Sequence, residues 1–224
     1  RKAAVCDATA QRLAETWGGE CISIPADMAT LEGIEGFVSE LSGKESHVDI
    51  LVNNAGVAWG APLEEFPEVG WDKVMDTNVK GVFFLTQKLL PLLEQNAAHD
   101  APSHIINVGS IDGIKTPIFD NFSYGPSKAA VHHLTRVLAA HLIKRNIIVN
   151  GIAPGPFPTY MLSAGVGAGG DTENTDWDAL GKSNPRGRVG TPEDIAGLAI
   201  FLSSRASGFT VGDVITCDGG SVVS

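Results

Sequence analysis

Tyr124 and Lys128 are the two residues of this chain whose types and spacing most directly suggest chemistry. They stand four positions apart in the segment Tyr-Gly-Pro-Ser-Lys, and this spacing places two side chains on the same face of a helix. A tyrosine hydroxyl, with a pKa of about 10, exchanges protons poorly at neutral pH. An ammonium group beside it stabilises the phenolate and lowers that pKa, so the pair is a candidate for general acid–base catalysis. The alternative is a solvated helix face, on which the same spacing is common.

Ser110 is a further candidate because of where it stands relative to an apolar run at 104–108. If that run is a strand of a parallel sheet, Ser110 lies just beyond its carboxyl end, where open α/β sheets bind their ligands. There its hydroxyl can donate a hydrogen bond to a carbonyl oxygen that becomes negative during reduction. The alternative is an ordinary turn or N-cap serine.

Amide side chains mark two more positions. Residues 53–56, Asn-Asn-Ala-Gly, follow the apolar run 48–52, and their small and amide side chains allow a ligand to come close; a plain turn is the alternative. Asn78 lies inside a helical pattern beside Val79, although Asn is a mediocre helix former. It is either functional or a buried amide whose hydrogen bonds are satisfied.

Helix and strand signals alternate along the chain, and these elements must position the polar groups. Gly18-Gly19 and a Thr30 N-cap mark two of the boundaries. The expected helices are 2–17, 31–41, 71–93, 122–144 and 192–203, and the expected strands are 21–24, 48–52, 104–108, 147–152 and 213–217. Strands separated by helices of this length form a parallel sheet covered on both faces. We therefore predict an α/β fold with a doubly wound, Rossmann-type parallel sheet, in one domain over residues 1–224.

Residues 155–190 interrupt this regular order, because they are rich in Gly, Pro and Asp. Connections of this length are uncommon in compact domains and are usually functional. We interpret the segment as a mobile lid over a substrate pocket; a flexible surface insertion is the alternative.

Composition and charge exclude several classes of protein. The 224 residues carry a formal net charge of −10, which argues against binding nucleic acid through its phosphates. No apolar run reaches the ~18 residues of a membrane span, and three separated cysteines indicate a reducing, cytoplasmic compartment rather than a disulfide framework. His132 and His133 are neighbours, so they point to different sides of a helix, and no His-Glu-x-x-His-like pair occurs. We expect structural or surface histidines and no metal site.

Taken in order, these residues resemble the short-chain dehydrogenase/reductase superfamily over essentially the whole chain. The similarity rests on residues 53–56, Asn78, Ser110, Tyr124 and Lys128, and on the segments Pro154-Gly155-Pro156-Phe157-Pro158-Thr159 and Gly212-Asp213-Val214-Ile215-Thr216-Cys217-Asp218-Gly219-Gly220. The segments 59–63, 90–93 and 184–190 resemble those of reductases of 3-oxoacyl thioesters, including the rhamnolipid-pathway type. Each motif is weak by itself, but their order and spacing together are specific.

The resemblance implies a role for each catalytic position. Tyr124 would donate a proton to the carbonyl oxygen in reduction and accept one in the reverse direction. Lys128 would lower the pKa of Tyr124 and bind the nicotinamide ribose, and Ser110 would hold and polarise the substrate carbonyl. Asn78 would organise a water that links Lys128 to solvent.

The resemblance also implies contacts to coenzyme and substrate. The coenzyme positions are Asp27 near the adenine, Asn54, Ala55 and Gly56 beside the adenosine ribose, Tyr124 and Lys128, and Pro154, Gly155, Phe157 and Thr159 around the nicotinamide. Candidate substrate-pocket residues, adjacent to the catalytic positions, are Ser110, Ile111, Asp112, Phe119, Phe157 and Met161. If Asp112 faces the pocket, a polyol or sugar-derived substrate gains support over a bare acyl chain.

One part of the family pattern does not occur in these 224 residues. It is the opening strand, Thr-Gly-x-x-x-Gly-x-Gly loop, helix and second strand, which together occupy roughly 30 residues. We therefore expect the chain to be N-terminally incomplete, with its catalytic residues present and the seat of the coenzyme pyrophosphate missing. Arg1 falls where the second strand would end, and a basic residue there favours NADP(H) over NAD(H); a charge on a helix terminus is the alternative.

The expected function is the NAD(P)(H)-dependent interconversion of a small-molecule ketone and its secondary alcohol, with a 3-oxoacyl thioester as the first candidate substrate. A sugar or polyol dehydrogenase is one alternative. A non-catalytic binding or scaffold protein is another, although it would not explain why all four catalytic-type residues are present. The helices at 71–93 and 122–144 and the acidic, Gly-rich C-terminal end resemble interfaces of family members, so we expect a homodimer or homotetramer.

Overall fold

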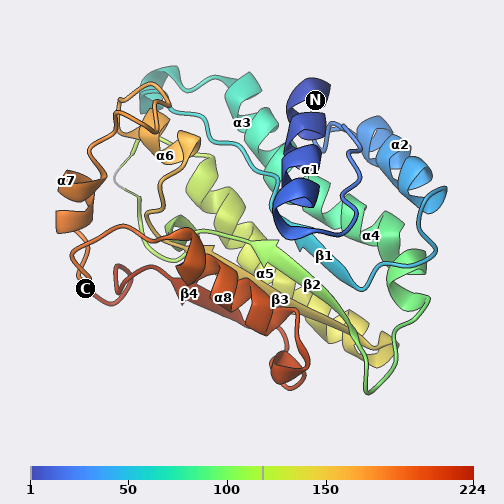
Figure 1. Ribbon diagram of the computed structural model, residues 1–224. Coiled ribbons are helices and arrows are strands. Elements are labelled where there is room, and N and C mark those ends of the chain that lie inside the picture. The colour runs from blue at the N-terminus through green and yellow to red at the C-terminus, as the bar shows by residue number, and fades with distance from the viewer. Residues whose placement is uncertain (1, 118) are drawn as a thin grey trace.

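The core of the computed structural model, which describes residues 2–117 and 119–224, is a four-stranded parallel sheet (Figure 1). The strands, in the order in which they pair, are β1 (Ile50–Asn53), β2 (Ser103–Val108), β3 (Ile147–Pro154) and β4 (Val214–Cys217). Because each strand pairs in parallel with the next one along the chain, a crossover connection must join every pair. The predicted parallel α/β sheet is confirmed.

Helices precede the sheet and fill most of the crossover connections. The α-helices are α1 (Ala3–Trp17), α2 (Leu31–Ser42), α3 (Glu68–Met75), α4 (Gly81–Glu94), α5 (Tyr124–Leu142), α6 (Tyr160–Gly165), α7 (Trp177–Lys182) and α8 (Pro192–Leu202). A π-helical turn, η2 (Asp76–Lys80), joins α3 to α4, and short 3-10 turns are η1 (Leu63–Glu65), η3 (Ile111–Gly113), η4 (Ile143–Arg145) and η5 (Arg205–Ser207). Within the described residues, no helix combines the length and the apolar character needed to cross a bilayer.

Different helices cover the two faces of the sheet. On one face Ile105 and Val149 pack with buried side chains of α2, α4 and α5. On the other face Ile106 and Ile152 pack against Leu202 of α8. Neighbouring residues of a strand point to opposite faces, which is why Ile105 and Ile106 belong to different clusters. Figure 1 shows α5 and α8 on opposite sides of the strands, so the doubly wound arrangement is confirmed.

Two predicted helix boundaries are confirmed by their local geometry. α1 ends at Trp17 with Gly18 as its C-cap, and Gly18 and Gly19 have φ angles of 74° and 82°, which glycine adopts without strain. Thr30 Oγ1 accepts a hydrogen bond from Gly33 N at 3.1 Å, which caps the N-terminus of α2.

The strand predicted at 21–24 is wrong. These residues pair with no strand, and among the described residues β1 pairs only with β2. Ile50 and Val52 remain 46% and 49% exposed on β1. An apolar run forms a strand only where a neighbour supplies backbone hydrogen bonds, and a local pattern does not show whether that neighbour is there.

The helix predicted over 71–93 begins earlier, at Glu68, and changes its winding part-way. It consists of α3, the π-helical turn η2 and α4, and Asn78 lies within the π-helical turn. Single π-helical turns inside α-helices are frequent at functional sites. The irregular winding accounts for the Asn that disturbed the helical pattern.

Residues 155–190 contain the short helices α6 and α7 and are held by polar contacts. Ser163 Oγ lies 2.8 Å from Thr175 Oγ1 and donates to the Asp171 carbonyl oxygen at 3.0 Å. Asn184 Nδ2 donates to the Asp218 carbonyl oxygen at 2.8 Å, which ties the segment to the loop after β4. Its interpretation as a lid stays a prediction.

Candidate active site

The carboxyl ends of β1, β2 and β3 lie at one edge of the sheet. The register places Asn53 beside Asn107 and Val108 beside Ile152. The segments that leave this edge after the three strands are 54–56, 109–112 and 155–159. Ligands of open parallel sheets bind in the crevice outside such an edge, so the predicted site residues start from a suitable place.

Tyr124, Lys128 and Ser110 meet between α5 and the segment after β2. Lys128 Nζ donates a 2.9 Å hydrogen bond to the Val108 carbonyl oxygen and lies 5.5 Å from the centre of the Tyr124 ring. The Ser110 side chain is close enough to the Tyr124 hydroxyl to lower the tyrosine pKa as a hydrogen-bonding neighbour. Three side chains that are expected to act together are therefore in contact, and Lys128 is buried.

Burial dominates the titration of both groups on α5. It raises the pKa of Tyr124 to about 12, the Ser110 hydrogen bond acting against it and the Asp112 charge adding to it. It also lowers the pKa of Lys128 to about 8. Loss of water around the phenolate is the largest cause of the Tyr124 shift. The expectation that Lys128 lowers the pKa of Tyr124 stays a prediction.

Ser110 has both of the roles that its position suggested. Its Oγ accepts a hydrogen bond from Asp112 N at 3.1 Å, so it caps the 3-10 turn η3. A hydroxyl that accepts from a backbone amide still has its own proton to donate. Ser110 can therefore cap the turn and bind an oxygen at the same time.

Asn78 uses its whole amide group in hydrogen bonds. Its Oδ1 accepts from Val57 N at 2.9 Å, and its Nδ2 donates to the Val57 carbonyl oxygen at 2.9 Å and to Ser127 Oγ at 3.0 Å. Ser127 Oγ in turn donates to the Tyr124 carbonyl oxygen at 2.7 Å. Asn78 is thus a satisfied buried amide that ties η2 to the segment after β1 and to α5. Its proposed water relay stays a prediction.

A buried polar network behind the site was missed by the sequence reasoning. Asn53 Nδ2 donates to Asn107 Oδ1 at 2.8 Å and to Thr86 Oγ1 at 3.2 Å, and Asn107 Nδ2 donates to Thr135 Oγ1 at 3.0 Å. The network joins the ends of β1 and β2 to α4 and α5. The available signal was an Asn near the end of each of two apolar runs, which pair in register once the strands are parallel.

Asp112 and Asn121 add polar groups close to Tyr124. Burial raises the pKa of Asp112, while a hydrogen bond from Asn121 and the charge of Lys115 act to lower it. Within the described residues, Asn121 Oδ1 is buried without a hydrogen-bond partner. Asp112 is near enough to Tyr124 for its charge to raise the tyrosine pKa. Asp112 therefore lies near Tyr124 with Asn121 as a neighbour, and Asn121 was not among the predicted residues.

The surroundings of Lys128 fit a coenzyme that carries a ribose. A Cβ on Gly56 would lie 3.5 Å from Lys128 Nζ and from Asn78 Oδ1, so a residue without a side chain leaves the ammonium open on that side. Within the described residues the ammonium has one hydrogen-bond acceptor, and its other protons are available for ribose hydroxyls. Asn54 and Ala55 are exposed next to Gly56.

The segment after β3 has structural contacts of its own at the predicted coenzyme positions. Pro154 ends β3, and a Cβ on Gly155 would lie 2.7 Å from Asp218 Cα. The absence of a side chain at Gly155 is thus required by the neighbouring backbone. The ring of Phe157 packs on Gly190. Contacts of these residues with a coenzyme stay predictions.

Two other coenzyme positions serve as turn or cap residues. Thr159 Oγ1 accepts from Leu162 N at 3.2 Å and caps α6. Asp27 Oδ1 accepts from Ala29 N at 3.1 Å in the turn before α2. Arg1 lies outside the described residues.

The substrate-pocket candidates come from several segments. Ile111 and Asp112 belong to η3, directly after Ser110, and are half-buried. Phe119 and Met161 are also half-buried, Met161 in α6. Their contacts with a substrate stay predictions.

The adjacent histidines of α5 point to different sides, as predicted. His132 is buried and His133 is exposed. The described residues contain no cluster of three His, Cys, Asp or Glu side chains arranged to hold a metal ion.

Comparison with known proteins assigns this geometry to a family. The model of a family described as enoyl-(acyl carrier protein) reductase matches residues 2–222. The rhamnolipids biosynthesis 3-oxoacyl-(acyl-carrier-protein) reductase of Pseudomonas aeruginosa is 44% identical over 220 residues, which are 98% of this chain and 83% of that protein. The chain belongs to the short-chain dehydrogenase/reductase family.

Other short-chain dehydrogenases/reductases match over similar lengths. The 2-dehydro-3-deoxy-D-gluconate 5-dehydrogenase of Dickeya dadantii is 38% identical over 207 residues, 91% of this chain and 77% of that protein. The solved Pseudomonas aeruginosa RhlG/NADP active-site complex has a TM-score of 0.89 at 43% identity, covering 98% of this chain and 83% of that one. As a short-chain dehydrogenase/reductase, the chain is an oxidoreductase that interconverts a ketone and a secondary alcohol with a nicotinamide coenzyme.

Proposed function

We propose that the chain reduces the ketone of a 3-oxoacyl thioester with NADPH, using Tyr124, Ser110 and Lys128 as catalytic residues. The observation that carries the proposal is the proximity of the Tyr124 and Ser110 side chains, with the Lys128 ammonium 5.5 Å from the centre of the tyrosine ring. These three side chains offer a proton, a second hydrogen-bond donor and a positive charge at one point.

Each residue acts on the developing negative charge of the carbonyl oxygen. The coenzyme, when bound, supplies the hydride. Tyr124 donates its proton to the oxygen, and Ser110 donates a hydrogen bond to the same atom. Lys128 places its charge beside Tyr124 as the phenolate forms, and a water near Asn78 returns the proton from solvent.

A 3-oxoacyl thioester is supported by the Pseudomonas aeruginosa relative, a 3-oxoacyl-(acyl-carrier-protein) reductase that is 44% identical to this chain. The acyl chain would lie among Ile111, Phe119, Phe157 and Met161. Residues 155–190 would close over it as a lid within a single domain, because they follow the carboxyl end of β3.

A sugar-derived or polyol substrate is the second candidate, and the acceptors beside Tyr124 favour it. The Asp112 carboxylate can accept hydrogen bonds from substrate hydroxyls, and so can Asn121 Oδ1, which has no partner among the described residues. The Dickeya dadantii relative is a dehydrogenase of a deoxygluconate.

NADP(H) is the proposed coenzyme rather than NAD(H). The solved structure with a TM-score of 0.89 is an NADP complex. Arg1 is a basic residue at the position that the family resemblance associates with the 2′-phosphate, which a positive charge would bind.

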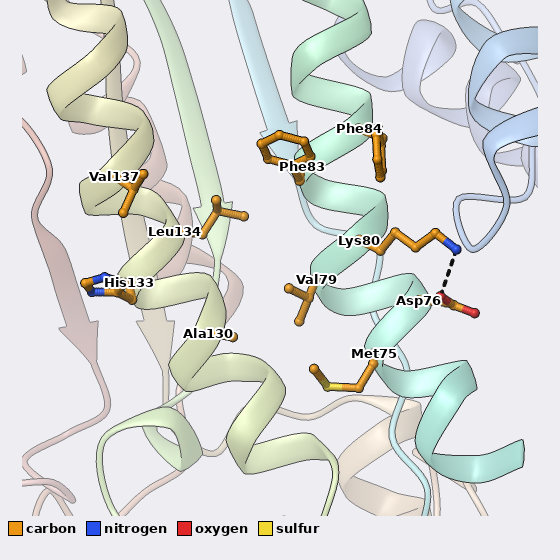
Figure 2. A pocket seen from close by; sticks show the side chains of 10 residues that line it. All are labelled: Met75, Asp76, Val79, Lys80, Phe83, Phe84, Ala130, His133, Leu134 and Val137. Atoms are coloured by element: carbon orange, nitrogen blue, oxygen red, sulfur yellow. Dashed lines mark hydrogen bonds and ion pairs between the residues drawn. The ribbon is translucent and has the colours of Figure 1, made fainter. Parts of the chain in front are cut away.

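We also propose a cytoplasmic homodimer or homotetramer that uses the face formed by α4 and α5. Figure 2 shows the apolar side chains of Val79, Phe83 and Leu134 between these two helices, at a groove that Val137 also lines. Lys80 points away from it and bonds to Asp76 at 3.1 Å. Exposed apolar grooves of this kind are common at protein interfaces. The cysteines, Cys6, Cys21 and Cys217, are free, in keeping with a reducing compartment.

The first test is a titration of the chain with NADPH and with NADH, followed by nicotinamide fluorescence. Saturable binding that is at least about tenfold tighter for NADPH supports the coenzyme assignment. Preference for NADH contradicts that assignment. If neither coenzyme binds, this chain does not perform the proposed reaction.

The second test compares coenzyme oxidation with a 3-oxoacyl thioester and with a keto-sugar acid as substrates. Tyr124→Phe should lower kcat by about 10²–10⁴-fold, because the proton donor is lost. Ser110→Ala should lower kcat as well. Ser46→Ala, at an exposed serine that is not among the predicted site residues, is the control and should not lower kcat. Turnover of the keto-sugar acid alone would replace the thioester by the second candidate. Full activity of Tyr124→Phe would overturn the proposed mechanism.

A further inference from the structure

His132 lies one helical turn beyond Lys128 and continues the row of side chains that starts at Tyr124. The three residues follow one another at four-residue intervals on α5, a spacing that aligns side chains on one helical face. His132 is 5% exposed, so its imidazole is buried beneath the segment that carries Ser110. No catalytic role proposed above uses this ring.

The imidazole contacts the backbone of Ser110 directly. Ser110 N donates a hydrogen bond to His132 Nε2 at 3.4 Å. On the other side of the same residue, Ser110 Oγ accepts from Asp112 N at 3.1 Å. The backbone of Ser110 therefore fixes the position of the hydroxyl that faces Tyr124, and His132 holds the amide of that backbone.

Two glycines make room for this ring. A Cβ on Gly109 would overlap His132 Nε2 and lie 2.5 Å from Cδ2. A Cβ on Gly113 would lie 2.8 Å from Cε1 and 2.7 Å from Ala129 N. The segment from Gly109 to Gly113 thus wraps the imidazole closely at both ends of the Ser110 turn, and neither glycine has a positive φ that would explain it otherwise.

The protonation state of the ring suits an acceptor. Burial, together with the charges of Arg136 and Lys128, lowers the pKa of His132 to about 4. At neutral pH the ring is neutral, and because Nε2 accepts, its proton is on Nδ1. An imidazolium would present a donor at Nε2 and would face the Ser110 N–H with another N–H.

We propose that His132 is a positioning residue: its neutral imidazole, protonated at Nδ1, anchors the Ser110 amide so that the Ser110 hydroxyl meets Tyr124 and the substrate oxygen. The inference rests on the proposed function for the role of Ser110. The anchoring itself is independent of the reaction and can be measured without coenzyme or substrate.

The first experiment determines the tautomer in the wild-type chain by nitrogen-15 NMR of labelled histidine. We expect a protonated Nδ1 and an unprotonated Nε2 for His132, with no titration between pH 5.5 and 8, a range around the ordinary histidine pKa of about 6.5. His99, exposed in a loop, serves as the internal reference. A protonated Nε2, or titration of His132 in this range, overturns the proposal. This measurement needs no variant, so it stands even if a substitution prevents folding.

The second experiment separates anchoring from packing with two substitutions. His132→Gln keeps an acceptor at about the position of Nε2, and His132→Leu keeps apolar bulk without it. We expect the Ser110 amide proton to exchange at least about tenfold faster in His132→Leu and to regain protection in His132→Gln. His141→Gln and His141→Leu, at an exposed histidine of the same helix, are the matched controls. Equal exchange in His132→Leu and the wild type overturns the proposal.

The kinetic readout connects the anchor to Ser110. His132→Leu should lower kcat by about 10–100-fold, as misplacement of a catalytic group does, with little change in the KM for coenzyme, and His132→Gln should restore most of it. A loss that Gln does not restore would mean that the ring acts through packing, and it overturns the positioning role. If Ser110→Ala proves fully active while the tautomer and exchange results hold, the proposed function fails and the anchor does not.

Discussion

At the scale of single residues, burial away from water shifts the pKa values of the titratable side chains that α5 carries towards the site. Burial is the first cause of the shifted pKa of Tyr124, of Lys128 and of His132. In each case it favours the neutral form. At neutral pH Tyr124 therefore keeps its proton, as a proton donor must. His132 stays neutral and can accept the hydrogen bond that anchors Ser110.

The raised pKa of Tyr124 predicts a weakness in alkali. Between its ordinary pKa of 10.0 and about 12, the folded chain keeps a proton that the unfolded chain has released, so stability falls as the pH rises through this window. The shift of the Tyr124 pKa contributes about 2–3 kcal/mol to the free energy of unfolding below this window. Urea unfolding of the wild type and of Tyr124→Phe at pH 9.5 and 11.5 measures it. Subtracting the free energy of unfolding of Tyr124→Phe from that of the wild type cancels other titrations, such as that of Lys128. If this difference is the same at both pH values, the shift of the Tyr124 pKa is contradicted.

The lowered pKa of His132 predicts a weakness in acid. Between 6.5 and about 4 the unfolded chain binds a proton that the folded chain does not, so stability falls as the pH falls through this window. Between pH 7 and pH 4.5, the free energy of unfolding of His132→Gln should fall by about 2–3 kcal/mol less than that of the wild type. Urea unfolding at the two pH values tests this. Parallel losses in the two proteins would refute it, and His141→Gln, at an exposed histidine of the same helix, is the control.

At the scale of elements, close approach between segments decides which glycines are required. α2 has two glycines in contrasting surroundings. A Cβ on Gly33 would overlap the Asp27 carbonyl oxygen and lie 3.0 Å from Thr30 Oγ1, whereas a Cβ on Gly36 has nothing within 4 Å. The first glycine lets the turn at Asp27 pack on the start of the helix, and the second only weakens the helix.

The two glycines therefore give a matched pair of substitutions. Gly36→Ala should raise the free energy of unfolding by about 0.5–1 kcal/mol, because alanine loses less backbone entropy in a helix. Gly33→Ala should lower it by about 1–3 kcal/mol, because the methyl group forces the turn away. Urea unfolding at neutral pH measures both. The argument from close approach fails if the two substitutions act in the same direction.

At the scale of the whole molecule, the arrangement of α4 and α5 leaves an apolar groove exposed between these helices (Figure 2). Both helices also contribute buried residues to the core on one face of the sheet. A partner placed on this groove would thus press on the helix that carries Tyr124 and Lys128. Assembly and the geometry of the active site are expected to be linked for that reason.

A charge placed in this groove should prevent assembly. We expect the wild type to sediment as a dimer or tetramer and Val137→Glu, at a residue 40% exposed in the groove, to shift towards the monomer, because a buried unpaired carboxylate is costly. Val69→Glu, at a valine of α3 that is 63% exposed, is the control and should keep the wild-type mass. A monomeric wild type, or an unchanged mass of Val137→Glu, would rule out this face as the interface.

The local pattern of the sequence determined the alternation of helices and strands, the helix boundaries at Gly18 and Thr30, and the placing of Ser110, Tyr124 and Lys128. Such features depend on residues close together in the chain, whose spacing is visible without a structure. The position of Ser110 at the ligand-binding edge of the sheet followed as well, since parallel strands gather their carboxyl ends at one edge.

Only the tertiary structure decided the features that depend on distant residues. Residues 21–24 form no strand because no neighbouring strand pairs with them, and Asn78 is satisfied because Val57 and Ser127 reach it. His132 became an acceptor for Ser110, and burial raised the pKa of Tyr124. Hydrogen-bond partners and the exclusion of water are set by segments that meet only on folding, and a local pattern therefore cannot reveal them.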